Sequence, residues 1–182
     1  MIELNPQYTD AYNNLGQIHY DLSRYSDAID NFEVARSLDS QELSYQICLS
    51  YLYLLQDDIE NSEKIIDVIF NNESKSRIFL NHGLLMSRKG ETRKAHESWT
   101  IGLQGLDLDS NRDRAIYYVF SLALGQVKEG LDNMKLLAKE CHDKSVFSNA
   151  LNEATIISRS PQPVEGINDL ITILEMTIAQ LP

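Results

Sequence analysis

The stretch that decides the fold is Thr9 to Glu42, TDAYNNLGQIHYDLSRYSDAIDNFEVARSLDSQE. Apolar and small side chains recur at helical spacing in each half, which predicts two amphipathic helices joined by a polar turn. They are Tyr12, Leu15, Gly16 and Ile18 in the first half and Ala28, Phe32 and Ala35 in the second. Because Gly16 and Ala28 are small, we expect the two backbones to approach closely, with Phe32 filling the space beside them.

The same pattern recurs four more times along the chain. Residues equivalent to Ala28 follow at spacings of 34, 33, 35 and 36, at Ser62, Ala95, Gly130 and Gly166. Four residues after each small residue comes a bulky apolar one: Phe32, Ile66, Trp99, Met134 and Leu170. The agreement weakens toward the end, where Glu153 occupies a position that should be packed. Five helix pairs are therefore predicted, the last the least regular.

The first of these segments resembles the tetratricopeptide repeat, a helix–turn–helix unit of about 34 residues. That family's pattern of a large aromatic, Leu-Gly, then Ala, Phe and Ala is met here, although its terminal Pro is replaced by Ser40. The resemblance implies an all-α chain, a right-handed superhelical solenoid of antiparallel helix pairs. We expect residues 1–8 to end a preceding repeat. Repeats should then follow at 9–42, 43–75 and 76–110, with divergent pairs at 111–146 and 147–182.

Composition limits the partners. The net charge of −11 argues against nucleic acid and anionic membranes. Residues 1–75 hold 14 acidic and 4 basic side chains, a net −10, whereas residues 76–182 hold 13 and 12, a net −1. A solvated acidic surface is the simpler interpretation, and steering of a basic partner is the alternative.

Several features of the sequence bear on where the protein works. No apolar run approaches the roughly 20 residues of a membrane span, and the start has no pattern of a secretory signal. Cys48 and Cys141 fall in different predicted repeats, so free thiols and a reducing, cytoplasmic location are expected. Pro6 at the end of a repeat motif and the broad apolar face of 167–181 predict a piece of a longer protein.

No catalytic constellation is evident in the sequence. The histidines, His19, His82, His96 and His142, lack metal-binding spacing, and no Gly-rich phosphate loop occurs. Neighbouring Cys141 and His142 point apart on a helix and cannot act as nucleophile and base. We therefore expect neither an enzyme nor a cofactor or metal.

The resemblance implies that the first helices of successive pairs line a concave, peptide-binding groove. On each first helix we take residues at positions i, i+4 and i+7 as its lining: Asn13, Gln17, Tyr20, Ile47, Tyr51, Leu54, Leu80, Leu84, Ser87, Ala115, Val119 and Leu122. Its middle is apolar, which suits an amphipathic helix of a protein partner. We expect Tyr51, Leu54, Leu84 and Val119 to be partly exposed, so that Leu54→Asp or Leu84→Asp would lose the partner at little cost in stability.

Alternatives to a peptide groove stay open. The groove could be filled by the parent chain, the last helix could support self-association, or the segment could select substrates for a larger multidomain enzyme. The Lys/Asn/Arg clamp of chaperone-binding family members is absent, which argues against that kind of ligand. One turn in the acidic chain is basic, with Arg88, Lys89, Arg93 and Lys94. It is either a solvated turn or a docking point for an acidic partner.

Overall fold

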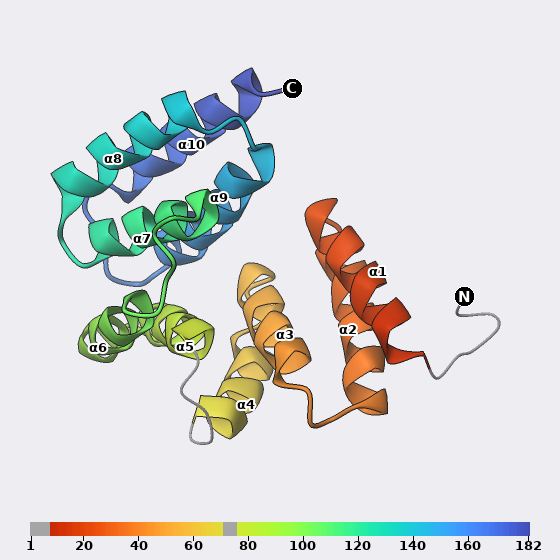
Figure 1. Cartoon of the computed structure of the whole chain (residues 1–182). Helices are drawn as coiled ribbons and strands as arrows, with labels where there is room; N and C mark the ends of the chain where they lie inside the picture. The colour runs from red at the N-terminus through yellow and green to blue at the C-terminus, as the bar shows by residue number, and fades with distance from the viewer. Residues whose placement is uncertain (1–7, 71–75) are drawn as a thin grey trace. The chain divides into compact units, whose positions relative to one another are not determined.

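The structure, a computed structural model, describes residues 8–70 and 76–182. Within them the chain forms ten helices and no strand, which confirms the predicted all-helical array of antiparallel pairs (Figure 1). The helices are α1 (Thr9–Asp21), α2 (Tyr25–Leu38), α3 (Leu43–Leu55), α4 (Ile59–Phe70), α5 (Ser76–Arg88), α6 (Thr92–Leu103), α7 (Asn111–Ala123), α8 (Val127–Glu140), α9 (Lys144–Ser158) and α10 (Ile167–Gln180). The expected remnant of a preceding repeat falls on residues 1–8, of which 1–7 lie outside the described residues.

Small residues face large ones inside the helix pairs, as the sequence predicts. A Cβ added to Gly16 would lie 3.0 Å from the ring of Phe32, and one added to Gly83 would lie 2.3 Å from Cδ1 of Trp99. Both aromatic side chains are buried. The glycines are needed because any side chain at these points would occupy the volume of the aromatic ring.

The first four pairs share one turn geometry. Two residues beyond the first helix of each pair, the backbone enters the left-handed region, at Ser23, Asp57, Gly90 and Gly125. The next residue donates its N–H to the carbonyl five residues earlier, as Arg24 does to His19 at 2.8 Å. This is the hydrogen bond of a Schellman motif, which satisfies the last carbonyls of a helix. Identical turns place the second helices equivalently, with Ala28, Ser62, Ala95 and Gly130 each the fourth residue of its helix.

The fifth pair departs from this scheme, and the register expected for it is wrong. Helix α9 begins at Lys144, ahead of the expected start at 147. Gly166 precedes α10 with φ 75, so it caps the helix instead of lying within it, and the buried Leu170 takes the fourth position. The reason is the longer connection at residues 159–166, where Pro161 and Pro163 prevent a helix from continuing.

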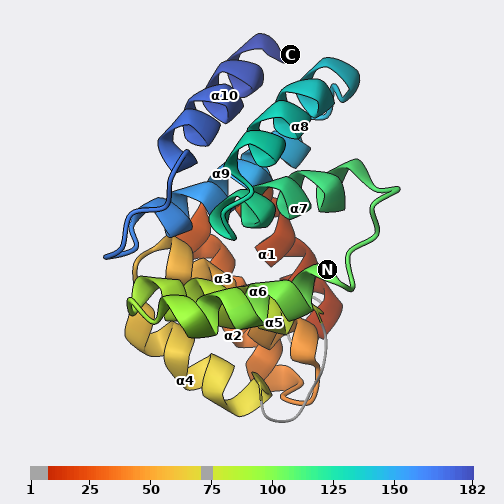
Figure 2. The ribbon, with the colours of Figure 1, turned by 90° about the vertical axis from the view of Figure 1, so that its left-hand side faces the viewer.

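The chain divides into two compact units, residues 1–74 and 75–182. In the first, α2 packs against α3 and joins the two pairs. In the second, α10 lies along α8, while α9 packs against α7 and also against α5 (Figures 1 and 2). Contact between α5 and α9 joins pairs that are not neighbours in the sequence, which a linear array does not require. The second unit is therefore folded more tightly upon itself than the repeat pattern predicts.

Candidate functional site

Five of the predicted groove residues form a partly accessible strip on α1 and α3. We call it the α1–α3 face: Asn13, Gln17, Tyr20, Ile47 and Tyr51, of which Gln17 is exposed and the others are half-buried. The rings of Tyr20 and Tyr51 lie 6.3 Å apart between centroids and are tilted by 60°. The Gln17 amide donates a hydrogen bond of 3.1 Å to Asp21 on the protein surface. The face thus offers side-chain amides beside an aromatic pair.

The partial exposure expected for three other groove residues is wrong. Leu54, Leu84 and Val119 are each 0% exposed. Helix α3 is apolar on more than one side, and Leu54 belongs to a buried set that includes Leu49 and Leu52. A helix that is hydrophobic on several sides buries most of its apolar side chains.

Four further members of the predicted groove, Leu80, Ser87, Ala115 and Leu122, are also buried. Two of them face the second helix of their own pair. A Cβ on Gly102 of α6 would lie 2.7 Å from Leu80, and a Cβ on Gly130 of α8 would lie 2.9 Å from Leu122. These leucines therefore fill the space inside a pair. Helical spacing alone predicted that they share one face of their helix, but it did not predict which helix that face contacts.

Helix α9 packs against α5, the helix that carries the predicted groove residues Leu80, Leu84 and Ser87. Arg77 and Leu84, seven residues apart, lie on one face of α5. At one end of this face, Arg77 Nη1 lies 3.6 Å from Glu153 Oε1 of α9. At the other end, Ser87 and Ser160 share a hydrogen bond between their hydroxyl groups. One predicted groove residue, Ser87, is thus bonded within the second unit, which favours an internal use of this part of the groove.

Glu153 is the most unusual side chain in this arrangement. It is 3% exposed, and its Oε2 has no hydrogen-bond partner among the described residues. Burial raises the pKa of this carboxyl group to about 7, although Arg77 and Arg112 act to lower it. The sequence pattern marked Glu153 as out of place, but its partners come from α5 and α7 and were not predicted.

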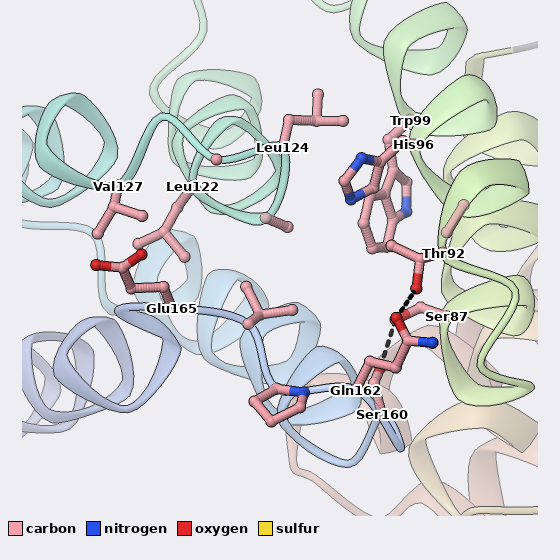
Figure 3. Close-up of a pocket in the computed structure, with 15 residues that line it drawn as sticks. Ser87, Thr92, His96, Trp99, Leu122, Leu124, Val127, Ser160, Gln162 and Glu165 are labelled. Carbon is pink, nitrogen blue, oxygen red and sulfur yellow. Dashed lines mark hydrogen bonds between the residues drawn. The ribbon is translucent and has the colours of Figure 1, made fainter.

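A cavity of about 200 Å³ lies in the second unit, between α6, the α7–α8 turn and the connection to α10 (Figure 3). Its apolar wall includes Trp99, Leu122 and Val127, and its polar rim includes His96 and Glu165. Thr92 Oγ1 donates to Gln162 Oε1 at 2.5 Å and holds the connection over the opening. The sequence did not predict this cavity because it forms only when residues 160–165 fold back onto α6.

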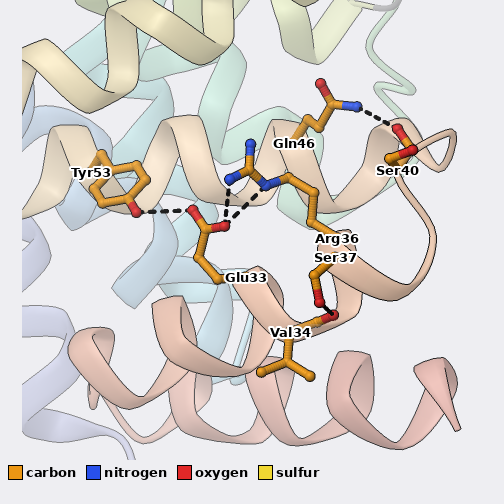
Figure 4. A network of polar contacts seen from close by, with 7 residues as sticks. All are labelled: Glu33, Val34, Arg36, Ser37, Ser40, Gln46 and Tyr53. Carbon is orange, nitrogen blue, oxygen red and sulfur yellow. Dashed lines mark hydrogen bonds and ion pairs between the residues drawn. The ribbon is translucent and has the colours of Figure 1, made fainter. Parts of the chain in front are cut away.

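In the first unit a polar network ties α2 to α3 (Figure 4). Tyr53 Oη donates to Glu33 Oε1 at 3.0 Å, and Arg36 Nε donates to Glu33 Oε2 at 3.0 Å. Burial and the bond to Glu33 raise the pKa of Tyr53 to about 12, so the phenol stays protonated. Glu33 and Arg36 also line an open hollow of about 320 Å³ with Ser37, Ser40, Gln46 and Val68. The bond between Tyr53 and Glu33 thus joins the first helix pair to the second.

Two of the four cations in the basic turn lie beside acidic side chains. Lys94 pairs with Glu91 at 2.5 Å, which lowers the pKa of Glu91, and Arg93 lies 3.8 Å from Glu97. Lys89 is exposed and Arg88 is half-buried. Docking of an acidic partner at Arg88, Lys89, Arg93 and Lys94 stays a prediction.

Two searches of the described residues bear on other kinds of site. Within 8–70 and 76–182, no three His, Cys, Asp or Glu side chains are grouped so that they could hold a metal ion. None of the helices in the same residues has the length and apolar character needed to cross a membrane.

Comparison with known proteins gives a structural likeness but no match in sequence. No protein-family model and no curated protein sequence matches the chain. Its structure is similar to the crystal structure of YrrB, a TPR protein with an unusual peptide-binding site, with a TM-score of 0.50 and 13% sequence identity. The match covers 98% of this chain and 91% of that one. At this identity the likeness shows the fold: the chain is folded as a tetratricopeptide repeat array.

Proposed function

We propose that this chain is a protein-interaction scaffold that binds an extended segment of a partner protein on the α1–α3 face. The observation that carries the proposal is that the residues of this face are accessible to solvent. Among the predicted groove residues of the first unit, Leu54 is buried, whereas Asn13, Gln17, Tyr20, Ile47 and Tyr51 are at least partly accessible. Amide side chains can pair with a peptide backbone, and paired tyrosines offer a large contact area at little entropic cost.

The composition of this face favours a ligand other than the amphipathic helix that the sequence predicts. With Leu54 buried, the face is too polar to favour the apolar side of an amphipathic helix, so we propose an extended peptide. Residues 8–70 hold 12 acidic and 3 basic side chains, a net −9, which favours a basic partner. YrrB, whose fold this chain shares, has a peptide-binding site, and this supports the proposal by analogy.

The experiment is a selection of random displayed peptides on the wild-type chain and on Gln17→Arg. Gln17 is exposed, so the variant should fold normally while placing a cation in the proposed site. Asp30→Asn, at an exposed residue of α2, changes the net charge equally and serves as the control. We expect wild type and Asp30→Asn to enrich the same basic peptides and Gln17→Arg to lose them. Equal enrichment by all three proteins would refute the α1–α3 face as the binding site.

We place this activity in the cytoplasm. Neither Cys48 nor Cys141 forms a disulfide among the described residues, which suits a reducing compartment. A chain found with its thiols blocked or bonded to a partner in cells would contradict this location.

Self-association through α10 is a second proposal, favoured by one observation. Met176 on α10 is 58% exposed, and Leu136 on the adjacent α8 is 50% exposed. Sedimentation at rising concentration should show a larger species if this surface pairs, and Met176→Glu should remove it. A single monomeric species in the wild type would exclude the idea.

A further inference from the structure

The cavity of about 200 Å³ in the second unit lies where the fifth pair departs from the repeat register (Figure 3). In each of the first four pairs three residues join the two helices, whereas eight residues, 159–166, join α9 to α10. Part of this longer connection forms one side of the cavity. Places where a chain departs from its own local pattern are expected to be functional or strained. The cavity is therefore a candidate binding site separate from the α1–α3 face.

Hydrogen bonds hold the connection in place beside α5 and α6. Thr92 Oγ1 donates to Gln162 Oε1 at 2.5 Å, and Gln162 Nε2 donates to the carbonyl oxygen of Gly90 at 3.4 Å. The hydroxyl groups of Ser87 and Ser160 share a further hydrogen bond. Because these polar groups bond to one another, the cavity is formed before any ligand enters, and binding would require little ordering of the protein.

The other end of the connection places a carboxylate beside an apolar wall. Gly166 has φ 75, and a Cβ added to it would lie 2.5 Å from Cγ1 of Val127 and 3.6 Å from Cδ1 of Leu122. This close approach fixes the preceding residue, Glu165, next to the same two side chains (Figure 3). The Glu165 side chain is exposed at the rim, so its carboxylate can reach a ligand in the cavity.

The wall on the side away from Glu165 is aromatic (Figure 3). His96 and Trp99 line it, with their ring centroids 5.8 Å apart. Aromatic rings favour packing against a further ring. An engineered cavity of about 150 Å³ binds benzene, so the volume here has room for a benzene ring and roughly two more heavy atoms. The size and the aromatic wall together favour a small aromatic ligand.

We propose that this cavity binds a small aromatic amine, with its ring near His96 and Trp99 and its ammonium group paired with Glu165. Among the residues that line the cavity, His96 and Glu165 are the two with ionisable side chains. At about pH 8 an ordinary imidazole is neutral, whereas a carboxylate and an alkylamine are charged. The cavity therefore favours a cation over an anion. All of these residues belong to the second unit, so the proposal does not depend on peptide binding to the α1–α3 face.

Fluorescence of Trp99, the single tryptophan of the chain, reports binding in this cavity. The full chain is titrated at about pH 8 with benzylamine, and with benzyl alcohol and benzoate as neutral and anionic probes of similar shape. We expect a saturable change with benzylamine and an affinity about two- to fivefold above that of benzyl alcohol, the range for an exposed ion pair. Benzoate should bind most weakly. A change that does not saturate, or equal affinities for the amine and the alcohol, would overturn the proposal.

Three variants locate the binding. Glu165→Gln keeps the shape without the charge and should abolish the preference for the amine, whereas Glu129→Gln, at an exposed residue of α8 outside the cavity, should retain it. Val164→Phe places a ring in the cavity itself and should remove binding of both probes. Because Glu165 is exposed, its variant keeps the test valid if Val164→Phe does not fold. A preference for the amine that persists in Glu165→Gln, or saturable binding in a folded Val164→Phe, would exclude this site.

Discussion

Gln17 and Leu84 occupy the same position, the ninth residue of the first helix, in pairs that otherwise share their small-and-aromatic packing. Gln17 is exposed, whereas Leu84 is wholly buried. In the first unit, residues of the first helices α1 and α3 stay partly accessible, and in the second unit α9 packs against α5. The difference shows that a repeat motif determines how a pair packs internally but not whether its outer face is accessible.

The largest expected effect comes from introducing aspartate, in separate variants, at the equivalent positions Leu84 and Gln17. Leu84→Asp would bury a carboxylate in an apolar contact and should cost more than about 4 kcal/mol of unfolding free energy. Gln17→Asp should change it by less than about 0.5 kcal/mol, because its side chain is solvated. Denaturant unfolding of both variants checks this. Similar losses for the two would mean that the faces do not differ as described.

Removing the aromatic wedge should affect both units. Trp99→Ala and Phe32→Ala should each lose about 3–5 kcal/mol, with the larger loss for Trp99, because each ring is buried against a glycine. If the two units unfold separately, each variant should shift only its own transition in a thermal melt. A melt unchanged by either substitution would contradict the packing of that pair.

The pH dependence of stability should distinguish the units. The folded-state pKa of Glu153, about 7, lies above its ordinary value of 4.5, so the folded protein holds this proton more tightly than the unfolded chain. The contribution is full below the ordinary pKa and is lost as pH rises to about 7, by roughly 3 kcal/mol at most. Unfolding of wild type and Glu153→Gln between these limits measures it. A second unit that gains stability over this range through Glu153 would contradict the expected sign.

The two glycines that face aromatic rings should differ in tolerance. A Cβ on Gly83 would approach Trp99 to 2.3 Å, so Gly83→Ala should cost about 2 kcal/mol through overpacking. A Cβ on Gly16 would lie 3.0 Å from Phe32, and part of that cost is offset by the better helix propensity of Ala. We expect less than about 1 kcal/mol for Gly16→Ala, measured by chemical denaturation. Equal costs would indicate that Trp99 can shift freely.

The smallest effect concerns the shared turns. Pairs one and two use Ser23 and Asp57 in the left-handed region, where pairs three and four use glycine. Ser23→Gly and Asp57→Gly should raise the stability of the first unit by a few tenths of a kcal/mol to about 1 kcal/mol, because L side chains are strained there. The same measurement on Gly90→Ala and Gly125→Ala should show the opposite sign. A loss of stability in the glycine variants would mean that the side chains hold the turn.

The sequence by itself determined the helices, their pairing and the identity of the residues that pack within a pair. These features are local, because a 3.6-residue period, a small residue and an aromatic sixteen residues later are all contained in one repeat. It also determined that Asn13, Gln17 and Tyr20 share a polar face of their helix. Where the motif was near consensus, at Gly16 with Phe32 and at Gly83 with Trp99, the expected packing is confirmed.

Only the tertiary structure decided which outer faces stay accessible. Helical spacing made Leu84 and Gln17 equivalent, and nothing in either helix predicts that one is buried and the other exposed. The structure adds the connection at residues 159–166, which delays α10 by four residues, and a contact between α5 and α9 whose residues, Arg77 and Glu153, are 76 apart in the sequence. The partners of Glu153 come from the same long-range packing. Such contacts are set by how whole pairs fit together, a property of three-dimensional shape that the periodicity of one helix does not contain.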